Sequence, residues 1–300
     1  MEKLIAGEEN KYIRKLINLI CNFISNFKVN GYNATEFESM KNSTSNVRTK
    51  LFIEICENCY LEYERWLKEN HAVDFEDMIN ESARLLREVK QMKQKLDFKY
   101  IIIDEYQDIS KQRFDLTKAL SDVKDAKIIA VGDDWQSIYA FSGSDISLFT
   151  KFKEKMGYAK LLKIVNTYRN SQDVIDIAGN FIQKNTEQIT KRLISSKRII
   201  NPVVIYTYDS TSKVVNQNRR SGANYAMAHA IEIALSQLIE YKKQKGKQPG
   251  TILLLDRYSF DGDRLERSGL FEYIKKGSRI KSVKYPKLDI TFMTVHSSKG

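Results

Sequence analysis

Cysteine is scarce in this chain of 300 residues, which carries only Cys21, Cys56 and Cys59. Cys56 and Cys59 have the spacing of half a zinc site, but a structural zinc site needs four ligands and no second pair follows at a suitable distance. Both residues fall in a helical pattern, so we expect buried, reduced thiols, which fit a protein of the cytosol. The cysteine content therefore disfavours a zinc centre.

Long hydrophobic runs and a secretory leader are also missing. No window approaches the roughly 18 uninterrupted apolar residues that a membrane helix needs. The first residues, MEKLIAGEENKYIRK, reach polar side chains too early for a signal peptide. With 42% hydrophobic and 29% charged residues, the composition is typical of a soluble globular protein. We expect a cytoplasmic protein of one large domain or two ordinary ones, with no membrane partner.

The net charge of +11 favours a polyanionic partner, and nucleic acid is the commonest one. The alternative is a basic protein that binds nothing in particular. Much of the excess lies in short runs such as residues 241–247, which we interpret as a solvated helix end. Charge alone therefore does not identify the partner.

The hydrophobic pattern changes character along the chain. Residues 12–27 and 47–68 have apolar side chains at helical spacing, so the first 95 residues are predicted to be mostly helical. Short apolar runs typical of buried parallel strands follow at 100–103, 128–131, 161–165, 203–206, 252–255 and 290–295. Helical patterns intervene at about 110–121, 171–185, 222–244 and 263–276. Alternating strands and helices predict an α/β fold with a largely parallel sheet, and a boundary near 151–160.

Two adjacent carboxylates follow the first predicted strand, in the stretch IIIDEYQD that covers residues 101–108. Parallel sheets bind ligands at the carboxyl ends of their strands. Neighbouring strand residues point in opposite directions, so Asp104 and Glu105 are expected to do different work. One suits Mg²⁺ held through its water shell, and the other suits activation of a water molecule. The alternative is a helix start at which acids favour the helix dipole.

The sequence resembles the UvrD/Rep family of superfamily 1 DNA helicases at two ordered motifs. DEYQD is similar to the Walker B motif (motif II) of that family, usually DExQD. Residues 131–143, VGDDWQSIYAFSG, resemble its motif III, which reads close to VGDxxQSIYxFxG. The VDFEDM stretch at 73–78 is similar to the segment that precedes motif II. Trp135 and the FSGSD stretch resemble the variants found in the helicase IV branch. The short interval between motifs IV and V, which are described below, is also similar to that branch.

The resemblance implies roles for residues of these motifs. In such an enzyme Asp104 holds Mg²⁺ and Glu105 activates water. Gln136 senses the γ-phosphate, because its amide both donates and accepts hydrogen bonds. Tyr139 and Phe141 provide flat faces for unpaired bases. Without the resemblance, both aromatics would be interpreted as core residues. Many relatives have Arg where Ser142 stands, which puts one DNA contact in doubt.

Two further motifs fall in the second half of the chain. NTYRNS, residues 166–171, resembles motif IV, which makes Arg169 a candidate arginine finger and Tyr168 a candidate for stacking on adenine. The alternative for Arg169 is a surface residue at a strand end. MTVHSSKG, residues 293–300, resembles motif V, in which Thr294, His296 and Ser297 are expected to contact DNA phosphates.

The sequence departs from the family because GxxxxGK[ST], the loop that cradles nucleotide phosphates, is absent. We expect a helical subdomain at 1–95, the second half of a first RecA-like motor domain at 96–157, and a second RecA-like motor domain at 158–300. The implied function is an ATP- and Mg²⁺-dependent DNA helicase of DNA repair type, moving 3′ to 5′ on single-stranded DNA, with this chain alone inactive. The alternatives are a non-catalytic DNA-binding or regulatory relic, and a subunit completed by a partner that carries the loop.

Overall fold

The computed structural model describes residues 9–88, 96–209 and 222–299, with side chains from residue 12 onward. Residues 1–8 and 89–95 of the expected helical subdomain, and Gly300 of the last motif, lie outside this range. Contacts divide the chain into two compact units, Met1–Arg198 and Ile199–Gly300. Each unit combines helices with a sheet, which confirms the α/β class. Within the described ranges, no helix combines the length and the apolar composition that a bilayer span requires.

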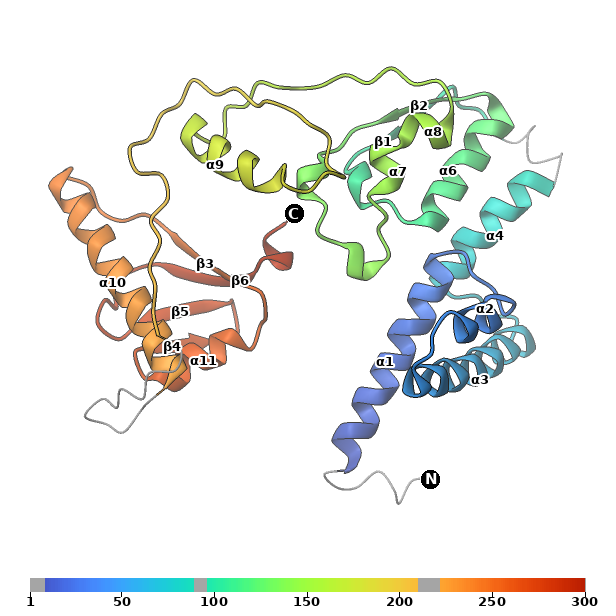
Figure 1. The fold of residues 1–300 in the computed structure, drawn as a ribbon, viewed down its shortest axis with the longest axis horizontal. Helices are drawn as coiled ribbons and strands as arrows, with labels where there is room; N and C mark the ends of the chain where they lie inside the picture. Colours follow the sequence, from blue (N-terminus) through green and yellow to red (C-terminus); the bar gives the residue numbers. More distant parts are fainter. Residues whose placement is uncertain (1–8, 89–95, 210–221, 300) are drawn as a thin grey trace. The chain divides into compact units, whose positions relative to one another are not determined.

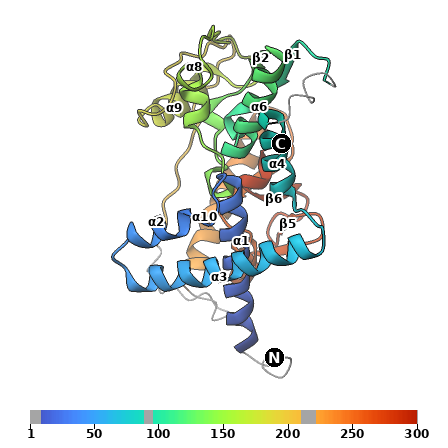
Figure 2. The same ribbon diagram turned by 90° about the vertical axis from the view of Figure 1, so that its right-hand side faces the viewer.

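The first unit begins with four helices, which Figures 1 and 2 show as one group. They are α1 (Glu9–Val29), α2 (Glu36–Asn42), α3 (Val47–Glu69) and α4 (Phe75–Glu88). The helices predicted at 12–27 and 47–68 are therefore confirmed. The core shared by α1, α2 and α3 contains Phe27, Phe37, Ile53, Cys56 and Tyr60, and the rings of Phe27 and Phe37 stack at 4.3 Å between centroids. Aromatic packing of this kind stabilises a small core beyond its buried area.

Lys28 joins three of these helices in the same region. Its ammonium group lies 2.7 Å from Glu64 of α3, 2.7 Å from Asp74 and 2.6 Å from Asp77 of α4. The Tyr63 hydroxyl donates to Asp74 at 3.1 Å. Burial alone would lower the pKa of Lys28, but its hydrogen bonds to the three carboxylates raise the pKa above the usual range. The VDFEDM segment therefore holds α1 by charge, through Asp74 and Asp77.

Two expectations for these helices are only partly met. Cys56 is buried, as predicted, and burial raises the pKa of its thiol to about 11. Cys59 is exposed, because the buried face of α3 runs through positions 53, 56, 60 and 67 and leaves position 59 beside it. The described residues hold no cluster of metal-ligating side chains. Ile13, Leu16 and Ile17 of α1 are exposed as well, so only the second half of that helix enters the core.

The remainder of the first unit is built on a parallel pair of strands, β1 (Tyr100–Ile103) and β2 (Lys127–Ala130). Ile103 pairs with Ala130, so both strands end at the same edge. Helix α6 (Lys111–Lys124) lies beside them (Figure 1). The buried cluster below this edge consists of Tyr106, Ile109, Phe114 and Leu148. The strands predicted at 100–103 and 128–131 and the helix predicted at 110–121 are thus confirmed, within a few residues.

Short helices complete this unit. They are η2 (Tyr106–Asp108), η3 (Asp134–Gln136), η4 (Ala140–Ser142), α7 (Ser147–Thr150), α8 (Phe152–Met156) and α9 (Gln172–Ile182). Helix α9 confirms the prediction at 171–185. The strand predicted at 161–165 is wrong: these residues form no strand, and Leu161, Leu162 and Ile164 are largely exposed. The residue that follows this run, Asn166, makes an isolated β-bridge with Ile194. An apolar run becomes a strand only where a backbone partner is available along its length.

The second unit is a four-stranded sheet in the order β3-β6-β5-β4. Its elements are α10 (Ala223–Gln244), β3 (Ile252–Asp256), α11 (Asp261–Ser268), β4 (Phe271–Ile274), β5 (Arg279–Ser282), β6 (Ile290–Thr294) and η5 (His296–Ser298). Strands β3 and β6 are parallel, and the other neighbours are antiparallel. The core includes Ala228, Leu265, Phe271, Ile280 and Phe292.

The second unit confirms α10, β3 and β6 and corrects two other predictions. The helix predicted at 263–276 ends at Ser268, because Gly269 adopts φ +75° and stops it. The β4–β5 hairpin follows, so the sheet is mixed and not largely parallel. The run 203–206 forms no strand and is mostly exposed. The domain boundaries expected at residues 95 and 157 stay predictions.

Candidate functional site

The acidic pair lies at the carboxyl end of β1, as expected for a ligand-binding edge. Asp104 and Glu105 are both exposed, and the backbone N–H of Glu105 donates to Asp104 Oδ1 at 2.9 Å. Glu105 adopts the left-handed region at φ +51°, which costs a residue with a side chain about 1–3 kcal/mol. The two carboxylates have different partners, because Asp104 accepts from the Glu105 N–H and Glu105 accepts from the Gln107 amide.

Gln107 connects the acidic pair to the segment after β2. It is fully buried; its amide donates to Glu105 Oε2, and its Oε1 accepts from the backbone N–H of Asp133 at 2.9 Å. Gly132 makes this approach sterically allowed, because a Cβ atom there would lie 2.5 Å from Gln107 Oε1. Gln107 stands inside the DEYQD stretch, but sequence reasoning gave it no role. Only its burial between two motifs identifies it as a link between them.

Gln136 lies at the end of η3, which begins one residue after Asp133. The amide of Gln136 donates to Asp133 Oδ2 at 2.8 Å. Burial alone would raise the pKa of Asp133, but hydrogen bonds from Lys191 and Gln136 hold that pKa below its usual value. Glu105, Gln107, Asp133 and Gln136 therefore form one hydrogen-bonded series. The structure thus brings together two of the predicted nucleotide-site residues, Glu105 and Gln136.

Lys191 is a member of this site that the sequence did not reveal. It pairs with both Asp133 and Asp134, and it lies 4.7 Å from the centre of the Trp135 ring. Its side chain is mostly buried, 13% exposed. More than fifty residues separate it from the acids, and no motif marks its position. A contact of this range is visible only in the folded chain.

Tyr139 and Phe141 lie in the segment that follows η3. Their ring centroids are 6.1 Å apart and the rings are tilted by 59°. Phe141 is 63% exposed, whereas Tyr139 is half-buried. Phe141 is thus not a core residue, although its aromatic side chain alone would suggest one. An exposed aromatic ring on a short helix is a suitable platform for an unpaired base.

Tyr168 and Arg169 are exposed. Their segment is attached to residues 194–197: Thr167 N–H donates to Ile194 O at 2.9 Å, and the Lys197 ammonium group donates to Tyr168 O. The structure therefore leaves the Arg169 side chain at the surface. The role of Arg169 as an arginine finger and the role of Tyr168 in stacking on adenine stay predictions.

Thr294, His296 and Ser297 lie together in the second unit, where β6 leads into η5. The hydroxyls of Thr294 and Ser297 are hydrogen-bonded, and Ser297 N–H donates to Thr294 Oγ1 at 3.1 Å. Asp256 of β3 accepts from Val295 N–H at 2.9 Å through its backbone carbonyl. Backbone and hydroxyl donors grouped at a strand end are suited to phosphate oxygens. Whether they contact DNA stays a prediction.

A second aromatic pair lies beyond the end of β3. The rings of Tyr258 and Phe260 stack at 5.0 Å between centroids, and both are about half exposed. The Arg257 guanidinium lies 5.4 Å from the Tyr258 ring.

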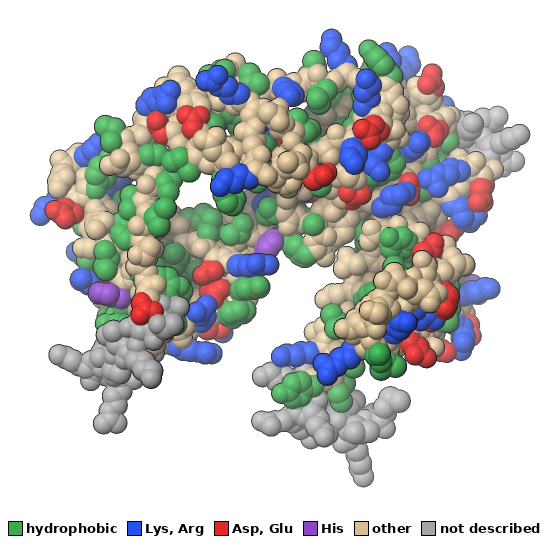
Figure 3. Space-filling view, viewed as in Figure 1, with side chains coloured by type: hydrophobic (Ala, Val, Ile, Leu, Met, Phe, Trp, Pro, Cys, Tyr) green, Lys and Arg blue, Asp and Glu red, His purple; other side chains and the backbone are tan. Residues whose placement is uncertain are grey.

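Figure 3 shows Lys and Arg side chains spread over the surface and mixed with Asp and Glu. The net positive charge is therefore not gathered into one patch on that face.

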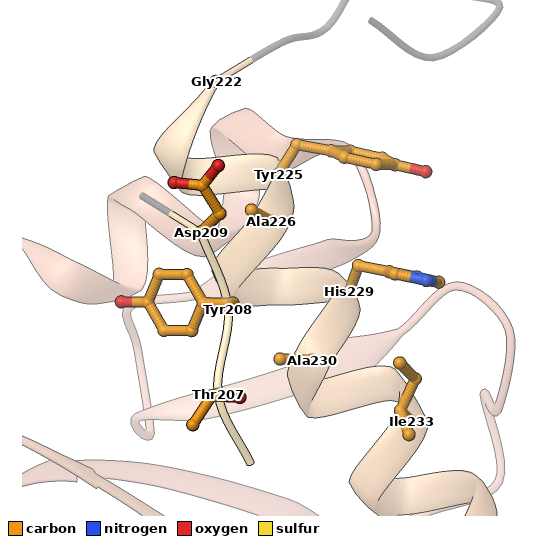
Figure 4. Close-up of a pocket in the computed structure, with 9 residues that line it drawn as sticks. All are labelled: Thr207, Tyr208, Asp209, Gly222, Tyr225, Ala226, His229, Ala230 and Ile233. Carbon is orange, nitrogen blue, oxygen red and sulfur yellow. The ribbon is translucent and has the colours of Figure 1, made fainter. Parts of the chain in front are cut away.

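A cavity of about 250 Å³ lies between residues 207–209 and α10. Figure 4 shows Tyr225 and His229 side by side on the helix, with Tyr208 on the other segment. The Tyr225 and His229 rings are parallel within 5°. The cavity contains none of the residues predicted from the motifs.

Comparison with known proteins identifies several similar sequences. The family model of the UvrD/REP helicase N-terminal domain matches residues 1–157. DNA helicase IV of Escherichia coli is 32% identical over 236 residues, which cover 78% of this chain and 29% of that helicase. The ATP-dependent DNA helicase PcrA of Staphylococcus epidermidis is 30% identical over 227 residues, 72% of this chain and 31% of PcrA. PcrA of Staphylococcus aureus is 27% identical over 230 residues. The chain therefore spans about 30% of the length of these curated relatives.

Proposed function

The chain belongs to the UvrD/Rep helicase family, and from this premise we propose that it is part of an ATP-dependent helicase that moves 3′ to 5′ along single-stranded DNA. In the complete motor, ATP lies between two RecA-like domains, the first of which ends near residue 157, where the family match also ends. Mg·ATP supplies the free energy, and closure of the cleft alters the grip on DNA. The relatives' names, DNA helicase IV and ATP-dependent DNA helicase PcrA, support this proposal.

One observation carries the proposal: the hydrogen-bonded series from Glu105 through Gln107 and Asp133 to Gln136. In the proposed mechanism Asp104 would hold Mg²⁺, which would neutralise charge on the phosphates, and Glu105 would take a proton from the attacking water. Gln136 contacts the γ-phosphate and the attacking water, and Arg169 neutralises charge in the transition state. The carboxylates, the amide and the guanidinium have the chemistry that Mg·ATP requires.

The same segment extends from the nucleotide site to the DNA site. Gln136 is followed three residues later by Tyr139 and then by the exposed ring of Phe141. In the proposal, a change in the hydrogen bonds of Gln136 is passed to the aromatic rings along this short connection. Thr294, His296 and Ser297 of the second unit hold DNA phosphates, which fix register without reading sequence.

Phosphate release from Mg·ATP, measured with and without single-stranded DNA, tests the catalytic part. We expect the 300-residue chain alone to be inactive, because it contains no GxxxxGK[ST] loop. Addition of a segment that bears this loop should produce hydrolysis that rises with DNA. DNA binding without hydrolysis in the completed protein would favour a non-catalytic relic. Activity that appears only with a separate loop-bearing protein would identify a two-subunit motor.

Replacement of Phe141 by alanine should weaken binding of the chain to an oligo-dT by about 1–3 kcal/mol, because stacking on the exposed ring is lost. Fluorescence anisotropy of a labelled oligonucleotide measures this change. Phe181→Ala is the matched control, since Phe181 is an exposed phenylalanine on α9, outside the segment. Equal affinity of Phe141→Ala and wild type would remove stacking at this position from the account.

A further inference from the structure

Two adjacent carboxylates in the segment after β2 share one lysine from the segment after α9. Lys191 Nζ lies 2.7 Å from Asp134 Oδ1 and also donates to Asp133 Oδ1. Asp134 is 1% exposed, and a buried carboxylate without a counterion is strongly unfavourable. The backbone N–H of Ile189 donates to its second oxygen at 2.6 Å. Lys191 therefore supplies one ammonium group that both neighbouring carboxylates contact.

The lysine also determines which way the Asp133 carboxylate faces. Asp133 Oδ1 accepts a hydrogen bond from Lys191 and another, at 3.2 Å, from the Trp135 backbone N–H. Its Oδ2 is thereby directed to the Gln136 amide, which donates at 2.8 Å. Asp133 N–H meanwhile contacts Gln107, the partner of Glu105. The ammonium group, together with the Trp135 N–H, thus orients the carboxylate to which the Gln136 amide donates.

Trp135 closes the contact between the two segments. Lys191 lies over its indole ring, and the ring packs on α9 so closely that a Cβ atom at Gly179 would lie 3.1 Å from Trp135 Cη2. Residues 133–136 are therefore held by α9 and by residues 189–191. In the sequence-based division, α9 and Lys191 belong to the second motor domain and Gln136 to the first.

We propose that Lys191 is a positioning residue, which orients Gln136 by holding Asp133 and Asp134 against the segment after α9. This inference rests on the proposed role of Gln136 as the sensor of the γ-phosphate. A change in the spacing of the two segments reaches Gln136 through the Lys191–Asp133 ion pair. Lys191 itself touches neither nucleotide nor DNA in this proposal. It makes the state of the nucleotide site depend on an element of the second motor domain.

The side-chain amide of Gln136 reports its own orientation in a ¹⁵N–¹H spectrum of the 300-residue chain. Its signal is assigned by its loss in Gln136→Glu. We expect Lys191→Met, which keeps the length and removes the charge, to shift this signal toward the position of an amide without the hydrogen bond to Asp133, and Lys191→Arg to restore it. Lys184→Met, at an exposed lysine just after α9, is the control and should leave the signal unchanged. An unchanged signal in folded Lys191→Met overturns the proposal.

Asp134→Asn tests the same link if Lys191→Met does not fold. Asp134 pairs with Lys191, whereas the Gln136 amide donates to Asp133, so the link predicts a shift of the Gln136 signal in this variant. No shift contradicts it. Trp66→Phe leaves Trp135 as the only tryptophan, and its quenching by acrylamide should rise in Lys191→Met and return to the wild-type value in Lys191→Arg.

Binding of oligo-dT separates this inference from the proposed function. We expect Lys191→Met to lower the affinity by about two- to thirtyfold, the effect of a mutation within a coupling network. A wild-type chain that does not bind oligo-dT contradicts the proposed function, whatever the Gln136 signal does. Wild-type binding with no response of the Gln136 signal to Lys191→Met contradicts only the role of Lys191.

Discussion

Glu105→Gln should reduce DNA-stimulated ATP hydrolysis by about a hundred- to ten-thousandfold, the usual contribution of a general base. The prediction applies to the protein completed with a phosphate-binding loop. The substitution removes the basic oxygen and keeps the shape, and a glutamine carbonyl still accepts the hydrogen bond that Gln107 donates. ATP binding should therefore persist. Phosphate release and equilibrium binding of a fluorescent ATP analogue measure the two quantities.

The matched control is Glu154→Gln, which changes an exposed glutamate on α8 in the same way. It should retain wild-type turnover. If Glu105→Gln hydrolyses ATP within about tenfold of wild type, Glu105 is not the base. If the variant instead loses nucleotide binding, Glu105 is assigned to holding Mg·ATP.

Lys28→Met should lower the free energy of unfolding of the first unit by about 3–5 kcal/mol, the usual cost of breaking a buried ion pair. Lys28 is 3% exposed, and its removal leaves Glu64, Asp74 and Asp77 close together without a cation. Repulsion between these carboxylates opposes the packing of α1 on α3 and α4. Urea unfolding followed by circular dichroism measures the change.

Lys41→Met provides the comparison, because Lys41 also pairs with two carboxylates, Glu38 and Glu57, but its side chain is 24% exposed. Solvent screens such a pair, so its loss should lower the free energy of unfolding much less than the loss of Lys28 does. Equal urea midpoints for Lys28→Met and Lys41→Met would mean that the Lys28 network does not hold the helices together.

Helices and strands could be predicted from the sequence where the spacing of apolar residues is regular and nearby residues determine where the element ends. Helices α1, α3, α6, α9 and α10 and strands β1, β2, β3 and β6 were expected close to where they lie. The helix expected at 263–276 failed because apolar spacing continues past Gly269, although the positive φ of that glycine ends the helix. Runs 161–165 and 203–206 failed because a strand depends on a backbone partner, which hydrophobicity does not report.

The candidate site divides in the same way. Asp104, Glu105, Gln136, Tyr139 and Phe141 could be proposed from the sequence because contiguous motifs carry them, and the structure places the first three around one edge of the sheet and its connected segment. Lys191 could not be predicted, since its partners are 57 and 58 residues away in the sequence. Gln107 was visible inside a motif, but its role depends on burial against Gly132.

The most direct test of the account is the affinity of the 300-residue chain for oligo-dT compared with duplex DNA of the same length, measured by fluorescence anisotropy at several salt concentrations. Exposed aromatic rings stack on unpaired bases only. We predict that the single strand binds at least about tenfold more tightly than the duplex, and that Phe141→Ala removes most of this difference. Equal affinity for both forms, falling together with salt, would show that net positive charge alone attracts DNA and would contradict the account.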